Sequence, residues 1–151
     1  MKITDALLGE HGLFYALFEQ IEQSIAGAGG DLPALTRTLA ALLGSHATIE
    51  EEHLFPALQP QMGEMGPLAV MEMEHRQIEG MIAQILDTSD IETLKHETRA
   101  LLDLTVQHFA KEEGVLFHMA EQFLDEPTLR KLGEDWAEVR GVNLDAMGCA
   151  A

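Results

Sequence analysis

Cysteine, aromatic residues and basic side chains are all scarce in this chain of 151 residues. Its single cysteine, Cys149, cannot form a disulfide within the chain, so we expect a reducing compartment. Only 9 lysines and arginines stand against 26 aspartates and glutamates, which gives a formal net charge of −17. Such a charge repels phosphate backbones and anionic lipid headgroups, so nucleic acid and membrane surfaces are poor candidate partners.

Long apolar runs are absent as well. No stretch reaches the roughly 18 consecutive apolar residues that a membrane-spanning helix requires. The first residues also lack the basic and then apolar pattern of a secretion signal. We therefore expect a cytoplasmic protein, with Cys149 in a frayed C-terminal tail.

Residues that favour helices fill the chain. Alanine, leucine, methionine, glutamate and glutamine abound, and their side chains lose little rotamer freedom in a helix. The composition predicts an all-α fold, with helices over residues 4–26, 31–58, 68–86, 89–123 and 125–140. Glycines among residues 27–30 separate the first two helices, and a segment rich in glycine and proline over residues 60–67 separates the second from the third. We expect Thr4 or Asp5 to cap the first helix, Pro56 to kink the second, and Ser89 with Glu92 to cap the fourth.

The chain also repeats itself. The string His46-Ala-Thr-Ile-Glu50 aligns with His108-Phe-Ala-Lys-Glu112, 62 residues later, and a Glu-His pair ending at residue 11 recurs 64 residues later. The first two helices therefore resemble a degenerate copy of the next two. This repeat predicts a pseudo-symmetric four-helix bundle.

Four histidines and two glutamates fall on the core-facing stripes of these helices. Residues four positions apart lie about 40° apart around a helix, so each HxxxE string places its histidine and glutamate on one inward face. The other two histidines have apolar neighbours at three and four residues. The six residues are His11, His46, Glu50, His75, His108 and Glu112.

Together these six side chains predict bound cations. One histidine on an apolar stripe is usually a hydrogen-bonded core residue, but a buried carboxylate costs several kcal/mol unless it is paired or binds a metal. No inward basic residue can neutralise the two glutamates, since Lys111 should point aside. Imidazole and carboxylate ligands suit iron, manganese or zinc, and six ligands exceed the four of a tetrahedral zinc site. We expect two ions bridged by Glu50 and Glu112, with His11 and His46 on one and His75 and His108 on the other.

The order of these ligands resembles that of bacterial hemerythrin-like proteins, the HHE cation-binding domains. Residues 3–11 and 46–56 are similar to that family as well, and the resemblance covers residues 3–124. It implies an antiparallel up-down four-helix bundle over residues 1–124. Beyond the reach of the resemblance, we expect residues 125–151 to form a short helical extension packed on the bundle or at a dimer contact. The resemblance also implies two iron ions joined by an oxo or hydroxo bridge, with zinc or manganese as substitutes.

The chain departs from the oxygen-carrying hemerythrins, which have HxxxH in the third helix and HxxxxD in the fourth. Here His75-Arg-Gln-Ile-Glu79 puts a glutamate in place of a histidine. As a further ligand Glu79 would favour ferric iron over reversible oxygen carriage; otherwise it is an exposed or outer carboxylate. Glu113, five residues after His108, is turned about 140° away from it on a regular helix, so we expect Glu112 to be the ligand.

Two alternatives concern single residues and the fold. Tyr15 occupies the repeat position equivalent to Glu79, where it could donate a hydrogen bond to a bound oxygen species or simply pack, which we favour. A ferritin-like carboxylate protein is the structural rival, because Glu50-xx-His53 and Glu72-xx-His75 both match its ExxH motif. That arrangement would leave three of the inward histidines without a role.

We expect a non-haem di-iron protein that binds dioxygen, peroxide or nitric oxide, used for redox chemistry, sensing or protection against oxidative or nitrosative stress. Iron storage and a peroxidase- or catalase-like enzyme are the alternatives, followed by an interaction domain without metal. The expected partner is the small gaseous or peroxide ligand. A second copy of the chain and an electron-donor protein are further candidates.

Overall fold

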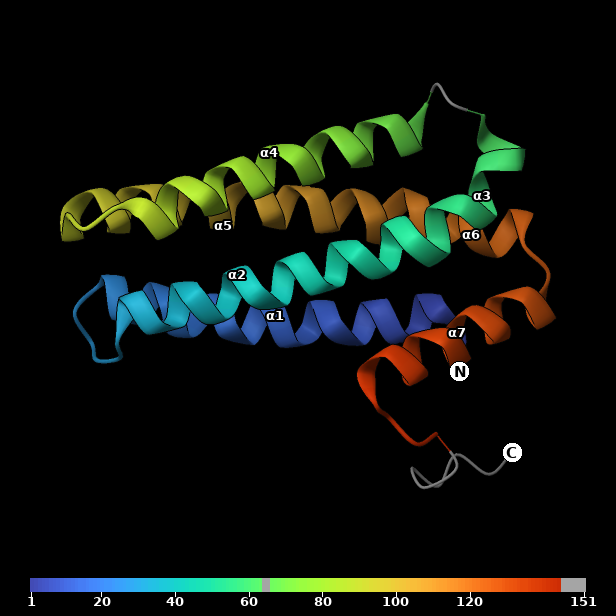
Figure 1. Cartoon of the computed structure of the whole chain (residues 1–151), viewed down its shortest axis with the longest axis horizontal. Helices are drawn as coiled ribbons and strands as arrows, with labels where there is room; N and C mark the ends of the chain where they lie inside the picture. The colour runs from blue at the N-terminus through green and yellow to red at the C-terminus, as the bar shows by residue number, and fades with distance from the viewer. Residues whose placement is uncertain (64–65, 145–151) are drawn as a thin grey trace.

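The computed structural model describes residues 1–63 and 66–144, and within them the chain is helical throughout apart from short connections. Four long helices form an antiparallel up-down bundle (Figure 1), as the sequence predicts. Among the described residues no helix has the length and apolar character needed to cross a bilayer. The α-helices are α1 (Ile3–Ile25), α2 (Leu32–Ile49), α3 (Phe55–Met62), α4 (Pro67–Asp87), α5 (Ile91–Lys111), α6 (Phe117–Phe123) and α7 (Glu126–Arg140).

Two predicted helix starts are wrong by one or two residues. The first helix follows Lys2, whose backbone N–H donates to the Asp5 carboxylate over 2.9 Å, while Thr4 is buried inside the helix. The cap of α5 is Asp90 rather than Ser89, and its carboxylate accepts from the backbone N–H of Thr93 at 2.8 Å. A charged carboxylate at this position also complements the helix dipole, which a serine hydroxyl does not.

The histidines mark a boundary between two apolar clusters. On α1, for example, Ile3 and Leu7 belong to one cluster and Phe14 and Phe18 to the other, with His11 between them. The same order of cluster, histidine and cluster recurs on α2 and α4, and in the fourth long segment the second cluster begins at Leu116, beyond His108 and the end of α5. The bundle therefore carries one polar layer between two apolar layers, and all four histidines lie in it.

Two of the long helical segments of the bundle contain a single π-helical turn, one between α2 and α3 and the other between α5 and α6. The turns are η1 (Glu50–Leu54) and η2 (Glu112–Leu116), in which Phe55 N–H donates to Glu50 and Phe117 N–H donates to Glu112, five residues back. The sequence predicts only a kink at Pro56, yet η2 has no proline and widens in the same way. Each turn begins at a buried glutamate, and π turns of this kind gather at functional sites.

Helix α7 packs against α1 beside the chain's N-terminus (Figure 1). The contact is close at Gly133, where a Cβ atom would lie 2.4 Å from the carbonyl oxygen of Met1. The division at residue 124 and the dimer contact stay predictions, and Cys149 lies outside the described residues.

Replacement of Gly133 by alanine is expected to lower the free energy of unfolding by about 1–3 kcal/mol, because the added methyl group must displace backbone. Gly80→Ala is the matched control, since nothing lies within 4 Å of its Cβ position on α4. It should stabilise the protein by roughly 0.5–1 kcal/mol through helix propensity. Urea unfolding measures both, and equal shifts in the two variants would contradict the close packing of α7.

Candidate metal centre

The six predicted residues meet at the middle of the bundle, in two overlapping groups of buried side chains. Within each group one ligand atom from every residue lies within 4.8 Å of the others. Glu50 and Glu112 belong to both groups, and each group takes its two histidines from adjacent helices. The groups are His11, His46, Glu50 and Glu112, and Glu50, His75, His108 and Glu112.

The Nε2 atoms of all four imidazoles face the shared carboxylates. Glu112 Oε1 lies 2.9 Å from His108 Nε2, and Glu112 Oε2 lies 3.3 Å from His11 Nε2. Glu50 Oε2 lies 3.5 Å from His46 Nε2 and 3.4 Å from His75 Nε2. Glu50 comes from the first half of the repeat and Glu112 from the second. Each of the two carboxylates lies between a histidine of one group and a histidine of the other.

Each histidine is oriented from behind by a further glutamate. A carboxylate only accepts hydrogen bonds, so the Nδ1 atom carries the proton and the Nε2 lone pair is left to point at the centre. This carboxylate–histidine arrangement is the one that fixes metal-binding imidazoles. The Nδ1–oxygen pairs are His11–Glu113 (2.9 Å), His46–Glu10 (2.6 Å), His75–Glu51 (2.7 Å) and His108–Glu74 (2.9 Å).

The centre has the chemistry of a cation site. Both carboxylate oxygens of Glu50 and of Glu112, together with His75 Nε2, are buried without a hydrogen-bond partner. The Nε2 atoms of His11 and His46 also face one another at 3.2 Å, and in the tautomer set by Nδ1 both are acceptors. Facing lone pairs and unpaired buried carboxylates are costly unless a positive charge lies between them. The donor set of imidazoles and carboxylates therefore fits metal ions such as iron.

The close contact of buried carboxylates and imidazoles also shifts the pKa values of the central residues. Burial alone would lower the pKa of His75, but the carboxylates of Glu112 and Glu50 outweigh it and raise that pKa to about 10. Burial alone would raise the pKa of Glu112, yet the surrounding imidazoles hold it well below its usual range. The neighbouring carboxylates likewise raise the pKa of His46 and of His108 against the effect of burial, so a metal ion would have to displace protons from these imidazoles.

Glu10 is the outer carboxylate with the most partners. Burial would raise its pKa, but hydrogen bonds from His46 and Arg140 lower it to about 2. The same neighbours act in reverse on His46, whose burial would lower its pKa while Glu50 and Glu10 raise it. Glu10 is thus a fixed negative charge behind a buried imidazole.

Aromatic rings enclose the layer on both sides. Phe109 stacks on the His11 ring with centroids 3.8 Å apart, and Phe55 stacks on the His75 ring at 5.5 Å. Ring faces of this kind exclude water from the Nε2 atoms and restrict rotation of the imidazoles.

Other predicted residues lie outside both groups. Glu79 is exposed on a regular stretch of α4, where buried Ile78 takes the inward position, so its role as a ligand stays a prediction. Tyr15 Oη donates to Glu113 at 3.0 Å rather than pointing at the centre, and burial followed by this bond raises its pKa to about 12. Glu72 is exposed and His53 is half-buried, and neither belongs to a metal-binding group among the described residues. The ferritin-like ExxH arrangement is therefore not formed there.

The sequence reasoning missed the four outer carboxylates. One signal was present, because Glu10-His11 and Glu74-His75 repeat as pairs. Each of these glutamates, however, serves the histidine of the neighbouring helix rather than the histidine next to it in sequence. Glu113 is indeed turned away from the centre, as its spacing predicts, but it holds the His11 ring.

Comparison with known proteins agrees with this site. A sequence model of the hemerythrin HHE cation-binding domain matches residues 2–120. The iron-sulfur cluster repair proteins YtfE of Escherichia coli and Escherichia fergusonii are 33% identical to this chain over 102 residues, covering 57% of this chain and 46% of each relative. The chain thus spans about half the length of these curated relatives. No solved structure matches significantly. The family match covers most of the chain, and the six buried histidines and glutamates at its centre could hold metal ions, so the chain belongs to the hemerythrin HHE cation-binding domain family.

Proposed function

We propose that the chain is a non-haem di-iron protein that binds a small oxidant, namely dioxygen, peroxide or nitric oxide, for redox chemistry, sensing or protection. The observation that carries this proposal is the pair of overlapping ligand groups that share Glu50 and Glu112. Two shared carboxylates between two pairs of histidines suit two cations better than one. Iron in that position would supply one-electron redox chemistry and a site at which a small oxidant can bind.

The protein's own residues would prepare the centre for such a ligand. The outer glutamates hold every imidazole with its Nε2 lone pair inward, so little reorganisation is needed when a cation or oxidant binds. Phe109 and Phe55 cover the imidazole faces and keep bulk water away. Because the two shared glutamates are fully buried, their charge acts at short range and in a weakly screening environment.

A small apolar cavity supports a small ligand. It has a volume of about 20 Å³, enough for one water-sized molecule, and reaches His46, His75 and His108 from the side of α2, α4 and α5. Leu43, Ile78 and other apolar side chains form most of its wall, with exposed Glu79 beside it. A diatomic molecule fits this space, whereas an organic substrate does not.

Iron-sulfur cluster repair is a second candidate, and it rests on the names of the relatives. The YtfE proteins are described as iron-sulfur cluster repair proteins, and the chain matches them over about half of their length. A shared di-iron domain would give the two proteins a common response to oxidants. We propose a role in protection against stress of this kind, in the cytoplasm and with an electron-donor protein as partner.

The His108→Ala variant is expected to lose at least one of two bound ions, because it removes an Nε2 ligand from one group. Element analysis after anaerobic reconstitution with Fe²⁺ measures this. His53→Ala is the control: His53 lies outside both groups and should leave two ions per chain. Iron loss only in the His53 variant would support the ferritin-like alternative instead.

Removal of the metal by a chelator should lower the melting temperature of the wild-type protein. Ligand at about 100 times its dissociation constant stabilises the folded state by roughly 2.7 kcal/mol. For a chain of this size that corresponds to a shift of roughly 5–10 °C. The His108→Ala variant should respond less, and an unchanged wild-type melting temperature would argue against a metal centre.

The diferric and diferrous proteins should differ in their absorption spectra, and addition of dioxygen, hydrogen peroxide or nitric oxide to the diferrous form should change the spectrum. Reversible change without product would indicate binding or sensing, while sustained peroxide loss would indicate an enzyme. A two-iron protein whose spectrum none of the three oxidants alters would refute the proposed function.

A further inference from the structure

The two ligand groups are related by the sequence repeat, yet their surroundings are unequal. Positions in the first two helices correspond to positions 62 or 64 residues later. A difference between equivalent positions therefore shows where the pseudo-symmetry of the centre is broken. Two such differences concern the outer carboxylates, and a third concerns the surface next to them.

The first difference lies behind His46, where α7 holds Glu10. Glu10 Oε1 accepts from Trp136 Nε1 and from Arg140 Nε, both at 2.7 Å, and Glu10 Oε2 accepts from Arg140 Nη2 at 3.1 Å. Arg140 also donates to Ser45 of α2. At the equivalent place in the other group, Glu74 accepts from Lys111 alone besides its histidine, among residues 1–63 and 66–144. The Glu10 carboxylate is thus fixed from two sides by a helix that lies beyond the family match at residues 2–120.

The second difference lies behind His11 and His75. Tyr15 donates its hydroxyl to Glu113, the partner of His11. The position equivalent to Tyr15 is Glu79, and an ionised carboxylate has no proton to donate to Glu51, the partner of His75. In the described part of the chain, Glu51 has His75 as its one hydrogen-bond partner, and its side chain is 47% exposed against 31% for Glu113.

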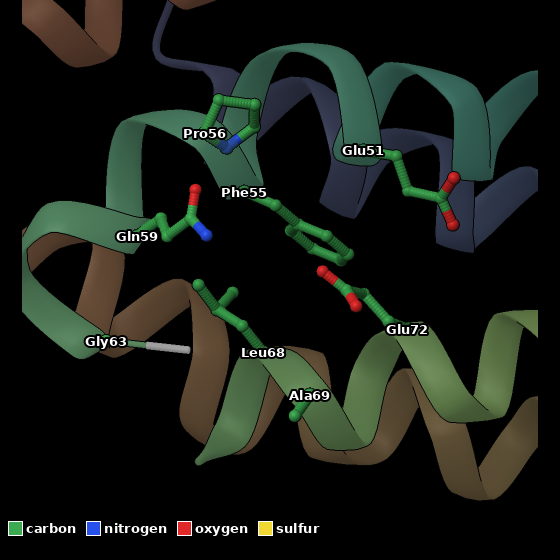
Figure 2. Close-up of a pocket in the computed structure, with 8 residues that line it drawn as sticks. All are labelled: Glu51, Phe55, Pro56, Gln59, Gly63, Leu68, Ala69 and Glu72. Atoms are coloured by element: carbon green, nitrogen blue, oxygen red, sulfur yellow. The ribbon is translucent and has the colours of Figure 1, made fainter. Parts of the chain in front are cut away.

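The third difference is the cleft beside Glu51. Figure 2 shows Gln59 and Phe55 facing Leu68 and Glu72 across it, with Glu51 at one end. Its volume is about 330 Å³. The equivalent hollow beside Glu113 measures about 140 Å³. It is narrowed where Glu121, the counterpart of Gln59, accepts from Thr4 and pairs with Lys2 across the gap.

All three differences hold the imidazoles of the His11–His46 group more firmly than those of the His75–His108 group. A histidine binds metal well when its outer partner fixes the ring, and loss of such a partner typically weakens metal affinity about 10–100-fold. Water in the open cleft competes for Glu51, so His75 is the least firmly held of the four rings. His46 is the most firmly held, because three donors from α7 lock its glutamate.

We propose that the centre is asymmetric, with the His11–His46 group retaining its cation and the His75–His108 group exchanging its cation with solution. Tyr15, Trp136 and Arg140 are the positioning residues of the retaining group. The inference rests on the two-cation centre proposed above. It adds that α7 strengthens the binding of one cation. It also adds that Glu79, which stands at the position equivalent to Tyr15, leaves the other cation exchangeable.

The test is the release of Zn²⁺, a redox-silent probe, from the fully loaded full-length chain into an excess of chromogenic chelator. Wild-type protein should release one ion per chain quickly and the second slowly. Arg140→Gln and Trp136→Phe should accelerate the slow phase about tenfold and leave the fast phase unchanged. Tyr15→Phe should act in the same direction, while Glu79→Tyr should slow the fast phase by supplying a hydroxyl to Glu51.

Arg130→Gln is the matched control on α7, since Arg130 pairs with Glu126 at the surface and does not touch Glu10. It should leave both phases unchanged. Trp136→Phe keeps an aromatic ring on α7 while it removes the N–H donor, and melting temperatures identify any variant in which α7 has detached. Acceleration of both phases in a variant of unaltered melting temperature would overturn the assignment to one group.

The two proposals fail in different ways. Wild-type protein that binds fewer than two ions would overturn the two-cation function and with it this inference. Two ions released in a single phase, or an Arg140→Gln protein whose release matches wild type, would overturn the asymmetry alone.

Discussion

The burial of Glu50 and Glu112 between four inward imidazoles is the constraint on which the rest of the structure depends. Neither carboxylate has a hydrogen-bond partner, so each needs positive charge from protons or cations within the layer. The apolar clusters on both sides keep the two carboxylates out of contact with solvent, and hydrogen bonds to the outer glutamates hold the imidazoles in one orientation. The same layer therefore contributes both to the stability of the bundle and to its capacity to bind metal.

The bundle shows how a repeat can build a pseudo-symmetric site and then diverge. Both halves keep the inward histidines, the shared carboxylates and the π turns that begin at those carboxylates. The two halves differ one hydrogen bond further from the centre. Tyr15 in the first half corresponds to Glu79 in the second, and Glu10 and Glu74 accept hydrogen bonds from different donors. Divergence at this distance changes how firmly a ligand is held and leaves the identity of the ligand intact.

Much of the fold and of the inner site is visible in the sequence, because helical periodicity alone places His46 with Glu50 on an inward face. The π turns are not, since their bonds to the fifth residue leave no trace in a pattern read at 3.6 residues per turn. The pairing of Glu10 with His46 also escapes, because it depends on the register between two helices. Glu79 sits at the same spacing from its histidine as Glu50, yet it is exposed, and α4 stays regular there whereas a π turn begins at Glu50.

Helix α7 and the centre share Glu10, and this gives the C-terminal part of the chain a thermodynamic connection to the metal. Any free energy that docking of α7 contributes to the orientation of His46 must be returned to the docking of α7 when His46 binds a cation, because coupling between two equilibria is reciprocal. An emptied centre therefore loosens the attachment of α7 by the same amount. The state of the bundle's interior is in this way transmitted to the molecular surface.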